Sequence, residues 1–272
     1  MEEQQEKTLT AEEQSRLDDK KLNIIQEINP DNSLIINKED KNAVSKGKFK
    51  KFWDSIKGGI VPFLIFLAVQ ELSWTGNMFL GKSGFQPEIW LDKQIPIVSE
   101  FIWMYFLTFP LAIFAFFWVT AKNKKHMWNL WLTAVISFAI SGIVYFFWQT
   151  EMIKPDFVPA TISDKFMVWT WSTCKPINCL PSQHCLMALA LVIAASGEKK
   201  STPLWMRILA WMFCVLIFMA TLFLRQHYIL DLVASIVVMV PTYLITKYCK
   251  FGEWMLKKQE QSNYKKQLKS EQ

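Results

Sequence analysis

Two histidines of this chain stand in settings that suggest chemistry. His184 ends the run PSQH at 181–184, and His227 is followed four residues later by Asp231. Residues at positions i and i+4 share one helix face, so Asp231 can hold the His227 imidazole in one tautomer and stabilise its charged form. A histidine held in this way is a typical nucleophile or general base. The simpler alternative is that both histidines only cap helices at a membrane interface.

Three further side chains could bind an anion beside these histidines. Lys154 follows an apolar segment, Ser182 lies two residues before His184, and Arg225 lies two residues before His227. Donors of this kind stabilise the oxygens of a phosphoryl group as negative charge develops on them. A single Lys or Arg beside an apolar segment is more typical of an interface anchor. The convergence of all these residues predicts phosphoryl transfer.

The elements that must position these residues are long apolar segments. Of the 272 residues 51% are hydrophobic, and the runs 101–120, 129–148 and 208–224 contain no Asp, Glu, Lys or Arg. Runs of about 20 such residues match the thickness of a bilayer, where only helices or closed barrels satisfy the backbone. The residues do not alternate as barrel strands would, so the predicted fold class is all-α, a polytopic membrane helical bundle. We predict six transmembrane helices, at 59–79, 100–120, 129–148, 182–197, 206–224 and 229–247.

The distribution of Lys and Arg predicts the orientation of this bundle. Nineteen of them flank the side that carries both termini, against six on the opposite side. Basic residues concentrate on the cytoplasmic side, so both termini are predicted to be cytoplasmic. The protein is then a multi-pass protein of the cell membrane, with its active site on the extracytoplasmic face. We expect a polar, largely disordered tail at 1–52, a catalytic membrane domain at 53–250 and a charged cytoplasmic tail at 251–272.

The histidine motifs resemble those of the type 2 phosphatidic acid phosphatase superfamily. PSQH at 181–184 is similar to the PSxH motif of that family. ATLFLRQHYILD at 220–231 resembles its last motif, which reads Ser-Arg, five residues, His, three residues, Asp. The predicted six-span topology is also that of the family, and the resemblance covers about residues 55–248.

This resemblance implies a membrane enzyme that acts on lipid phosphates through a phosphohistidine. His227 would be the nucleophile, Asp231 would orient it, and His184 would act as general acid and base. Lys154, Ser182 and Arg225 would bind the phosphate oxygens. The mechanism implies no metal and no cofactor, and the expected partners are a lipid phosphate substrate and membrane lipids, not nucleic acid.

The chain departs from the family pattern at two phosphate-binding positions. Ala220 and Thr221 replace the Ser-Arg of the last motif, and the first motif survives only as Lys154-Pro155. Arg225 lies one helical turn after Thr221 and could replace the missing Arg. These features look more like the inositol phosphorylceramide synthase branch, whose members transfer phosphorylated head groups between lipids. The leading prediction is a lipid phosphatase, and the alternatives are a head-group phosphotransferase and a non-catalytic lipid binder or transporter.

Cysteines and one acidic residue leave further alternatives open. Cys174, Cys179 and Cys185 bracket the PSQH motif. The first two could form a disulfide in an oxidising compartment, or all three could remain thiols, or the cluster could bind zinc together with His184. The last alternative would make this a metal-binding redox protein. Glu71 lies within the first predicted span, and it faces either the catalytic cavity or the interface.

Overall fold

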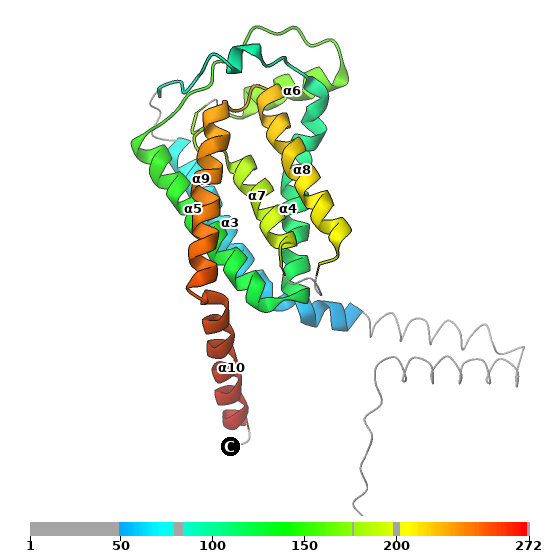
Figure 1. Cartoon of the computed structure of the whole chain (residues 1–272), viewed down its shortest axis with the longest axis vertical. Coiled ribbons are helices and arrows are strands. Elements are labelled where there is room, and N and C mark those ends of the chain that lie inside the picture. The colour runs from blue at the N-terminus through cyan, green and yellow to red at the C-terminus, as the bar shows by residue number, and fades with distance from the viewer. Residues whose placement is uncertain (1–48, 79–83, 176, 198–201, 271–272) are drawn as a thin grey trace, which may run out of the picture. The chain divides into compact units, whose positions relative to one another are not determined.

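The computed structural model describes residues 49–78, 84–175, 177–197 and 202–270, which form α-helices joined by loops and short 3-10 turns (Figure 1). In these ranges β-structure is limited to two isolated bridges. The chain divides into two compact units, Met1–Asp54 and Ser55–Gln272. Of the first unit only residues 49–54 are described, and they are helical, so most of the predicted tail at 1–52 lies outside the described residues.

Six of the helices described in the second unit occur where the apolar segments were predicted. Their ends agree with the predicted ends to within a few residues, and the largest difference is that α5 begins earlier, at Lys124. The all-α prediction is therefore confirmed. The helices that correspond to the six segments are α3 (Ile60–Met78), α4 (Ile102–Lys122), α5 (Lys124–Phe147), α7 (Gln183–Ala195), α8 (Leu204–Phe223) and α9 (Ile229–Tyr248).

Five helical segments in the described ranges are long and apolar enough to cross a membrane, which indicates a membrane protein. They are Phe49–Gly76, Ser99–Lys122, Lys124–Phe147, Leu204–Phe223 and Ile229–Tyr248.

Helix α7 differs from these five segments. It has 13 residues, so it is about 20 Å long, whereas the hydrocarbon core is about 30 Å thick. Most of its side chains are buried, and it packs against α4, α5, α8 and α9. The predicted fourth span is thus a short central helix enclosed by longer ones.

Close packing between helices depends on small residues. A Cβ atom at Gly142 of α5 would lie 2.9 Å from the Oγ atom of Ser73, so a larger residue there would separate α3 from α5. The Ser73 hydroxyl also donates a hydrogen bond of 2.8 Å to the carbonyl of Phe138. On the outer surface, large apolar side chains such as Leu64 and Val237 remain exposed, as expected for a lipid-facing surface.

Two helices were not predicted, α6 (Ile162–Thr173) and α10 (Phe251–Ser270). Helix α6 begins with a capping box between Thr161 and Asp164, and it lies at the end of the bundle where α8 ends and α9 begins (Figure 1). Helix α10 extends from the opposite end, and the amide of Gly252 donates to Oδ1 of Asn129 at 2.8 Å. The segment at 251–272, predicted only as a charged tail, is therefore mostly helical.

Candidate active site

The two histidine motifs meet because α7 and α9 begin side by side. The amide of Ser182 donates to the carbonyl of Asp231 at 3.4 Å. The Ser235 hydroxyl donates to the carbonyls of Ser182 and Asp231, at 3.1 and 2.8 Å. These bonds join the first two turns of α9 to the residue before α7, and they hold the two motifs in one register.

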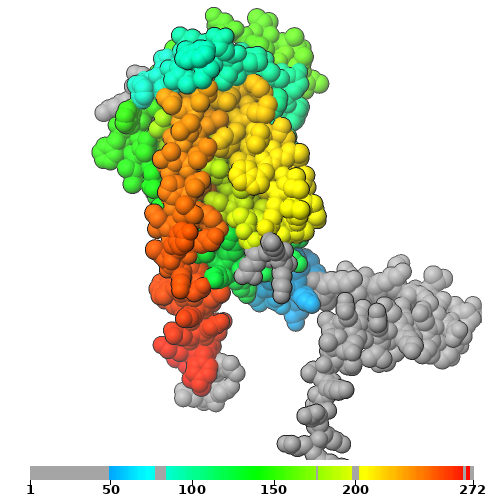
Figure 2. Space-filling model, viewed as in Figure 1, coloured from blue at the N-terminus to red at the C-terminus, as the bar shows by residue number. Residues whose placement is uncertain are grey.

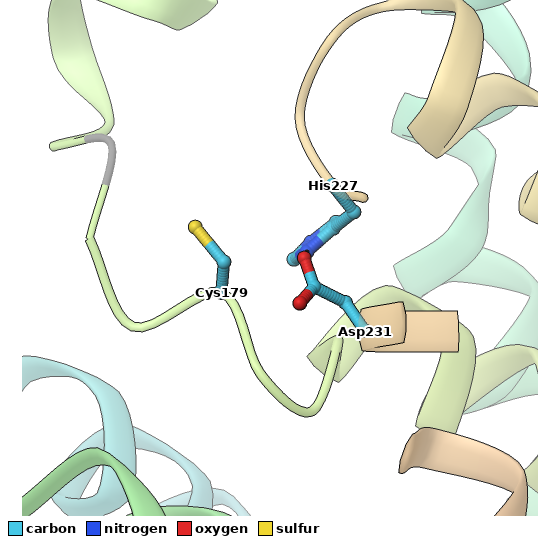
Figure 3. A group of neighbouring side chains, drawn as sticks. All are labelled: Cys179, His227 and Asp231. Carbon is cyan, nitrogen blue, oxygen red and sulfur yellow. The ribbon is translucent and has the colours of Figure 1, made fainter. Parts of the chain in front are cut away.

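His227 and Asp231 form a hydrogen-bonded pair, as the i, i+4 spacing predicted. The Nδ1 atom of His227 lies 3.2 Å from Oδ2 of Asp231, and the same oxygen accepts the amide of Tyr228 at 3.0 Å. Figure 3 shows the His227 ring beside the Asp231 carboxylate. Asp231 is fully buried, and 10% of the His227 side chain is exposed. A carboxylate oxygen only accepts, so the Nδ1 atom donates in this hydrogen bond, and in a neutral imidazole the Nε2 atom then has the lone pair.

His184 lies next to this pair. Its ring stacks on Tyr105 with centroids 3.9 Å apart, and its centroid is 6.3 Å from that of His227. Both histidines line a cavity of about 320 Å³. Aromatic side chains make up much of the cavity wall: Trp74, Tyr105, Phe106, Phe109, Tyr145 and Trp169.

Ser182 and Lys154 lie close to the histidines, but their polar atoms already have partners. Ser182 is buried as the N-cap of α7, where its hydroxyl oxygen accepts the amide of Cys185 at 3.3 Å. The Lys154 ammonium donates to the carbonyl of Arg225 and to Oε1 of Gln226, the latter at 3.3 Å. Burial lowers the pKa of Lys154 to about 8. The ammonium therefore braces the turn that carries His227, and Lys154 does not line the cavity.

Arg225 ends α8 and points away from the histidines. Its φ of 49° is left-handed, and the bonds from its amide to Leu222 and from the Gln226 amide to Thr221 form a Schellman motif. Its guanidinium donates to the carbonyls of Asp92 and Ile95, each at 2.7 Å.

The loop that Arg225 holds is also bonded to α9. The buried Asp92 carboxylate accepts the Ile229 amide at 2.9 Å. Figure 2 shows the segment before α4 covering the end of the bundle at which α8 and α9 meet. Arg225 thus fastens this loop over the turn, and it does not line the cavity.

The contacts of Arg225 predict that it positions the loop over the α8–α9 turn and does not bind the substrate. An Arg225→Gly variant can test this. Because the residue has a left-handed φ, Arg225→Gly relieves backbone strain while it deletes the guanidinium. We expect less than about a tenfold loss of kcat/KM, together with a lower unfolding temperature in detergent. Arg225→Ala should be less stable than Arg225→Gly, because alanine keeps the strain. A hundredfold loss of activity at unchanged stability would instead assign the guanidinium to the substrate phosphate.

Three amide side chains around the cavity were not singled out from the sequence. Both polar atoms of the Asn178 side chain and the Nε2 atom of Gln226 are buried without a hydrogen-bond partner. The Nε2 atom of Gln183 lies beside the Tyr145 hydroxyl without a hydrogen bond of normal geometry. All three amide residues line the cavity. One signal was available, because Gln183 and Gln226 each directly precede a motif histidine.

The structure also shows the positions of the cysteines, of Thr221 and of Glu71. None of the five cysteines forms a disulfide, so Cys174 and Cys179 carry thiols. Thr221, at the position of the family's Arg, is buried and donates to the carbonyl of Phe218 at 2.8 Å. Glu71 is exposed on α3, where it accepts the Thr75 hydroxyl at 3.1 Å, and it does not line the cavity.

The fold and the site together define a helical membrane protein with paired histidines in an aromatic cavity. A family model described as the PAP2 superfamily matches residues 81–245, a range that contains both histidine motifs. The chain belongs to this superfamily, whose members are phosphatases and phosphotransferases. No curated protein and no solved structure matches the chain.

Proposed function

We propose that the protein is a lipid phosphatase that forms a phosphohistidine on His227. The observation that carries this proposal is the placement of His184 and the His227–Asp231 pair across one apolar cavity. Nucleophilic attack and general acid–base catalysis require the reacting groups to lie within about 3 Å of the substrate atoms with which they react. The ring centroids lie 6.3 Å apart and both rings line the same cavity, so one phosphoryl group bound there could contact both imidazoles. The aromatic wall suits the apolar part of a lipid substrate.

The two chemical steps divide between the two histidines. In the first, the Nε2 atom of His227 attacks phosphorus, the bond to the leaving oxygen breaks, and His184 gives that oxygen a proton. In the second, His184 takes a proton from water, whose oxygen attacks phosphorus as the bond to His227 breaks. Asp231 stabilises the positive charge that His227 gains in the first step.

The phosphoryl oxygens need hydrogen-bond donors, and amide groups fit this need. The buried nitrogens of Asn178 and Gln226 lack partners around the cavity, and that of Gln183 lies beside the Tyr145 hydroxyl. Small rotations of these side chains would direct their N–H groups toward the substrate, whose oxygens would satisfy them. The N-terminus of α7, which Ser182 caps, would add its dipole to this proposed phosphate site, and Lys154 would hold Gln226 in place from behind.

A second candidate is a head-group phosphotransferase, in which an alcohol replaces water in the second step. Thr221 in place of the family's Arg favours this candidate, because the site then lacks a cation that holds a free phosphate. The non-catalytic alternative is disfavoured by the His227–Asp231 hydrogen bond, which a binder or transporter does not need.

The experiment that tests the proposal uses purified protein in detergent and a panel of labelled lipid phosphates. Release of inorganic phosphate without an alcohol supports a phosphatase. Label that moves to diacylglycerol or ceramide only when that alcohol is added supports a phosphotransferase. Absence of both reactions, in protein that remains folded, would contradict an enzymatic function.

We further propose that both termini are cytoplasmic and that the site faces the extracytoplasmic side. The excess of basic residues near the termini and in the loop at 122–125 supports this orientation. Single cysteines introduced at Lys165 and Lys124 of a cysteine-free variant test it with an impermeant thiol reagent. We expect the first to react in intact cells and the second only after permeabilisation, and the reverse pattern would contradict the proposal.

The loss of rate on replacement of His184 should depend on the leaving group of the substrate. With a lipid alcohol as leaving group, His184→Gln should lose about a hundredfold in rate, because no acid protonates the departing oxygen. A nitrophenyl phosphate has a leaving group that needs no proton, so its first step should proceed and phosphoenzyme should accumulate. Burst kinetics with the two substrates measure this difference. An equal loss on both substrates, without phosphoenzyme, would limit His184 to packing against Tyr105.

The lowered pKa of Lys154 predicts a change of activity near pH 8. Its pKa lies at about 8 in the folded protein and at its ordinary, higher value in the unfolded chain. Activity should therefore fall as pH rises through about 8, because the ammonium that holds Gln226 and the turn loses its proton. The free energy of unfolding should instead rise with pH above about 8, because the unfolded chain binds the Lys154 proton more tightly than the folded protein does. Lys154→Arg keeps its charge, so a profile unchanged by this substitution would contradict the prediction.

A further inference from the structure

A cysteine lies beside the proposed nucleophile and its carboxylate partner. Ligand atoms of Cys179, His227 and Asp231 all lie within 4.8 Å of one another. The three residues come from the loop before α7, the turn between α8 and α9, and the first turn of α9 (Figure 3). Cys179 and Asp231 are buried, and Cys179 and His227 line the cavity, which gives a solute access to the group.

The Asp231 carboxylate is only half satisfied. Its Oδ2 atom accepts from the His227 ring and from the Tyr228 amide. Its Oδ1 atom is buried and has no hydrogen-bond partner. An unpaired carboxylate oxygen in the interior is costly, and a cation can offset that cost. The nearby Lys154 ammonium is bonded instead to the α8–α9 turn.

We propose that Cys179, His227 and Asp231 bind a zinc ion, and that this ion inhibits the enzyme. A thiolate, an imidazole nitrogen and a carboxylate oxygen are ordinary zinc ligands, and water from the cavity would supply the fourth. In a tetrahedral zinc site with bonds of about 2.0–2.3 Å, two ligand atoms lie about 3.3–3.8 Å apart. The His227 Nδ1 and Asp231 Oδ2 atoms, 3.2 Å apart, already lie close to this range, and the Cys179 side chain would rotate toward them to complete the site.

The inhibition rests on the proposed role of His227. Zinc at the Nδ1 atom displaces the proton that this atom shares with Asp231. The proton moves to Nε2, and the Cys179 thiol releases its own proton to water as the thiolate binds the metal. An Nε2 atom that carries a proton has no lone pair for attack on phosphorus. Zinc thus blocks the nucleophile by fixing the wrong tautomer, and a chelator should restore activity.

The test uses chelator-treated protein in detergent, with cobalt as a spectroscopic probe and zinc as the inhibitor. Cobalt should give an absorption band of thiolate-to-metal charge transfer, and zinc should inhibit turnover. Cys179→Ser and Cys179→Ala should lose the band and need at least about tenfold more zinc for half inhibition. Each rate is compared with the rate of the same variant in chelator.

Cys185→Ser is the matched control, because Cys185 is also a buried thiol close to the site, and its Sγ atom lies 3.8 Å from the Thr221 hydroxyl. This variant should keep both the band and the wild-type response to zinc. Absence of the band in the wild type, or equal responses of the Cys179 and Cys185 variants, would overturn the metal site. The band does not depend on turnover, so failure of the proposed reaction would leave this measurement decisive.

Discussion

His227→Ala is expected to lower turnover by at least about ten-thousand-fold, the scale observed when a covalent nucleophile is removed. Without the imidazole no phosphoenzyme forms, and the remaining donors can only bind the substrate. Insertion and folding should be nearly unchanged, because His227 lies in a turn at the edge of a cavity and its backbone amide bonds to Thr221. Rapid-quench labelling checks this directly: wild-type protein should carry an acid-labile phosphoryl group, and the variant should carry none.

The control for His227 is a histidine outside the cavity. His126 is buried on α5, and its Nε2 atom lies 2.7 Å from the carbonyl of Ile193. His126→Gln keeps a polar group at this position and should retain both turnover and the phosphoryl label. If His227→Ala forms the label at the wild-type rate, another residue is the nucleophile.

The helices of the bundle could be predicted from the sequence because their signal is local. A run of apolar residues with no charge has few places in a fold except a membrane or a core, so the positions of α4, α5 and α8 follow from composition. An apolar run does not show whether the helix is surrounded by lipid or by other helices of the protein. The composition of α7 therefore predicted its apolar surroundings, but not that other helices would supply most of them.

Two helices were missed for a different reason. Helices α6 and α10 are stabilised by contacts rather than by long apolar runs. The capping box of Thr161 and Asp164 was a readable signal for α6. The approach of Gly252 to α5, where a Cβ atom would lie 2.2 Å from the carbonyl of Lys125, is a tertiary feature that no local pattern encodes.

The candidate site also combines a feature that could be predicted from local sequence with one that depends on tertiary contacts. The pairing of His227 with Asp231 was predicted from their i, i+4 spacing, although the structure makes it differently: His227 lies in the turn before α9, and Asp231, in the first turn of that helix, reaches back to it. The direction of a long side chain is set by its tertiary neighbours. Arg225 shares a helix face with Thr221 in the sequence, but the left-handed turn at the end of α8 sends its guanidinium to Asp92 and Ile95.

Asp231→Asn is expected to lower turnover by about a thousandfold with little effect on folding. The His227 and Tyr228 donors converge on one oxygen, Oδ2, and the other oxygen has no partner. An asparagine can therefore keep its carbonyl oxygen at the position of Oδ2 and place its NH₂ group at the position of Oδ1. Both hydrogen bonds and the His227 tautomer then survive, and only the negative charge is removed.

This variant consequently measures one physical effect, the stabilisation of a positive imidazole by a buried carboxylate. A loss of about ten-thousand-fold is known where such a substitution also fixes the wrong tautomer, so a smaller loss is expected here. Asp231→Ala removes the hydrogen bonds as well, and it should be both slower and less stable than Asp231→Asn. Comparison of the phosphorylation rates and unfolding temperatures of the two variants tests this order. If Asp231→Asn is as slow as Asp231→Ala at wild-type stability, the tautomer does not survive. If it is as fast as the wild type, Asp231 only caps α9, and the charge of the phosphohistidine must be stabilised by another group.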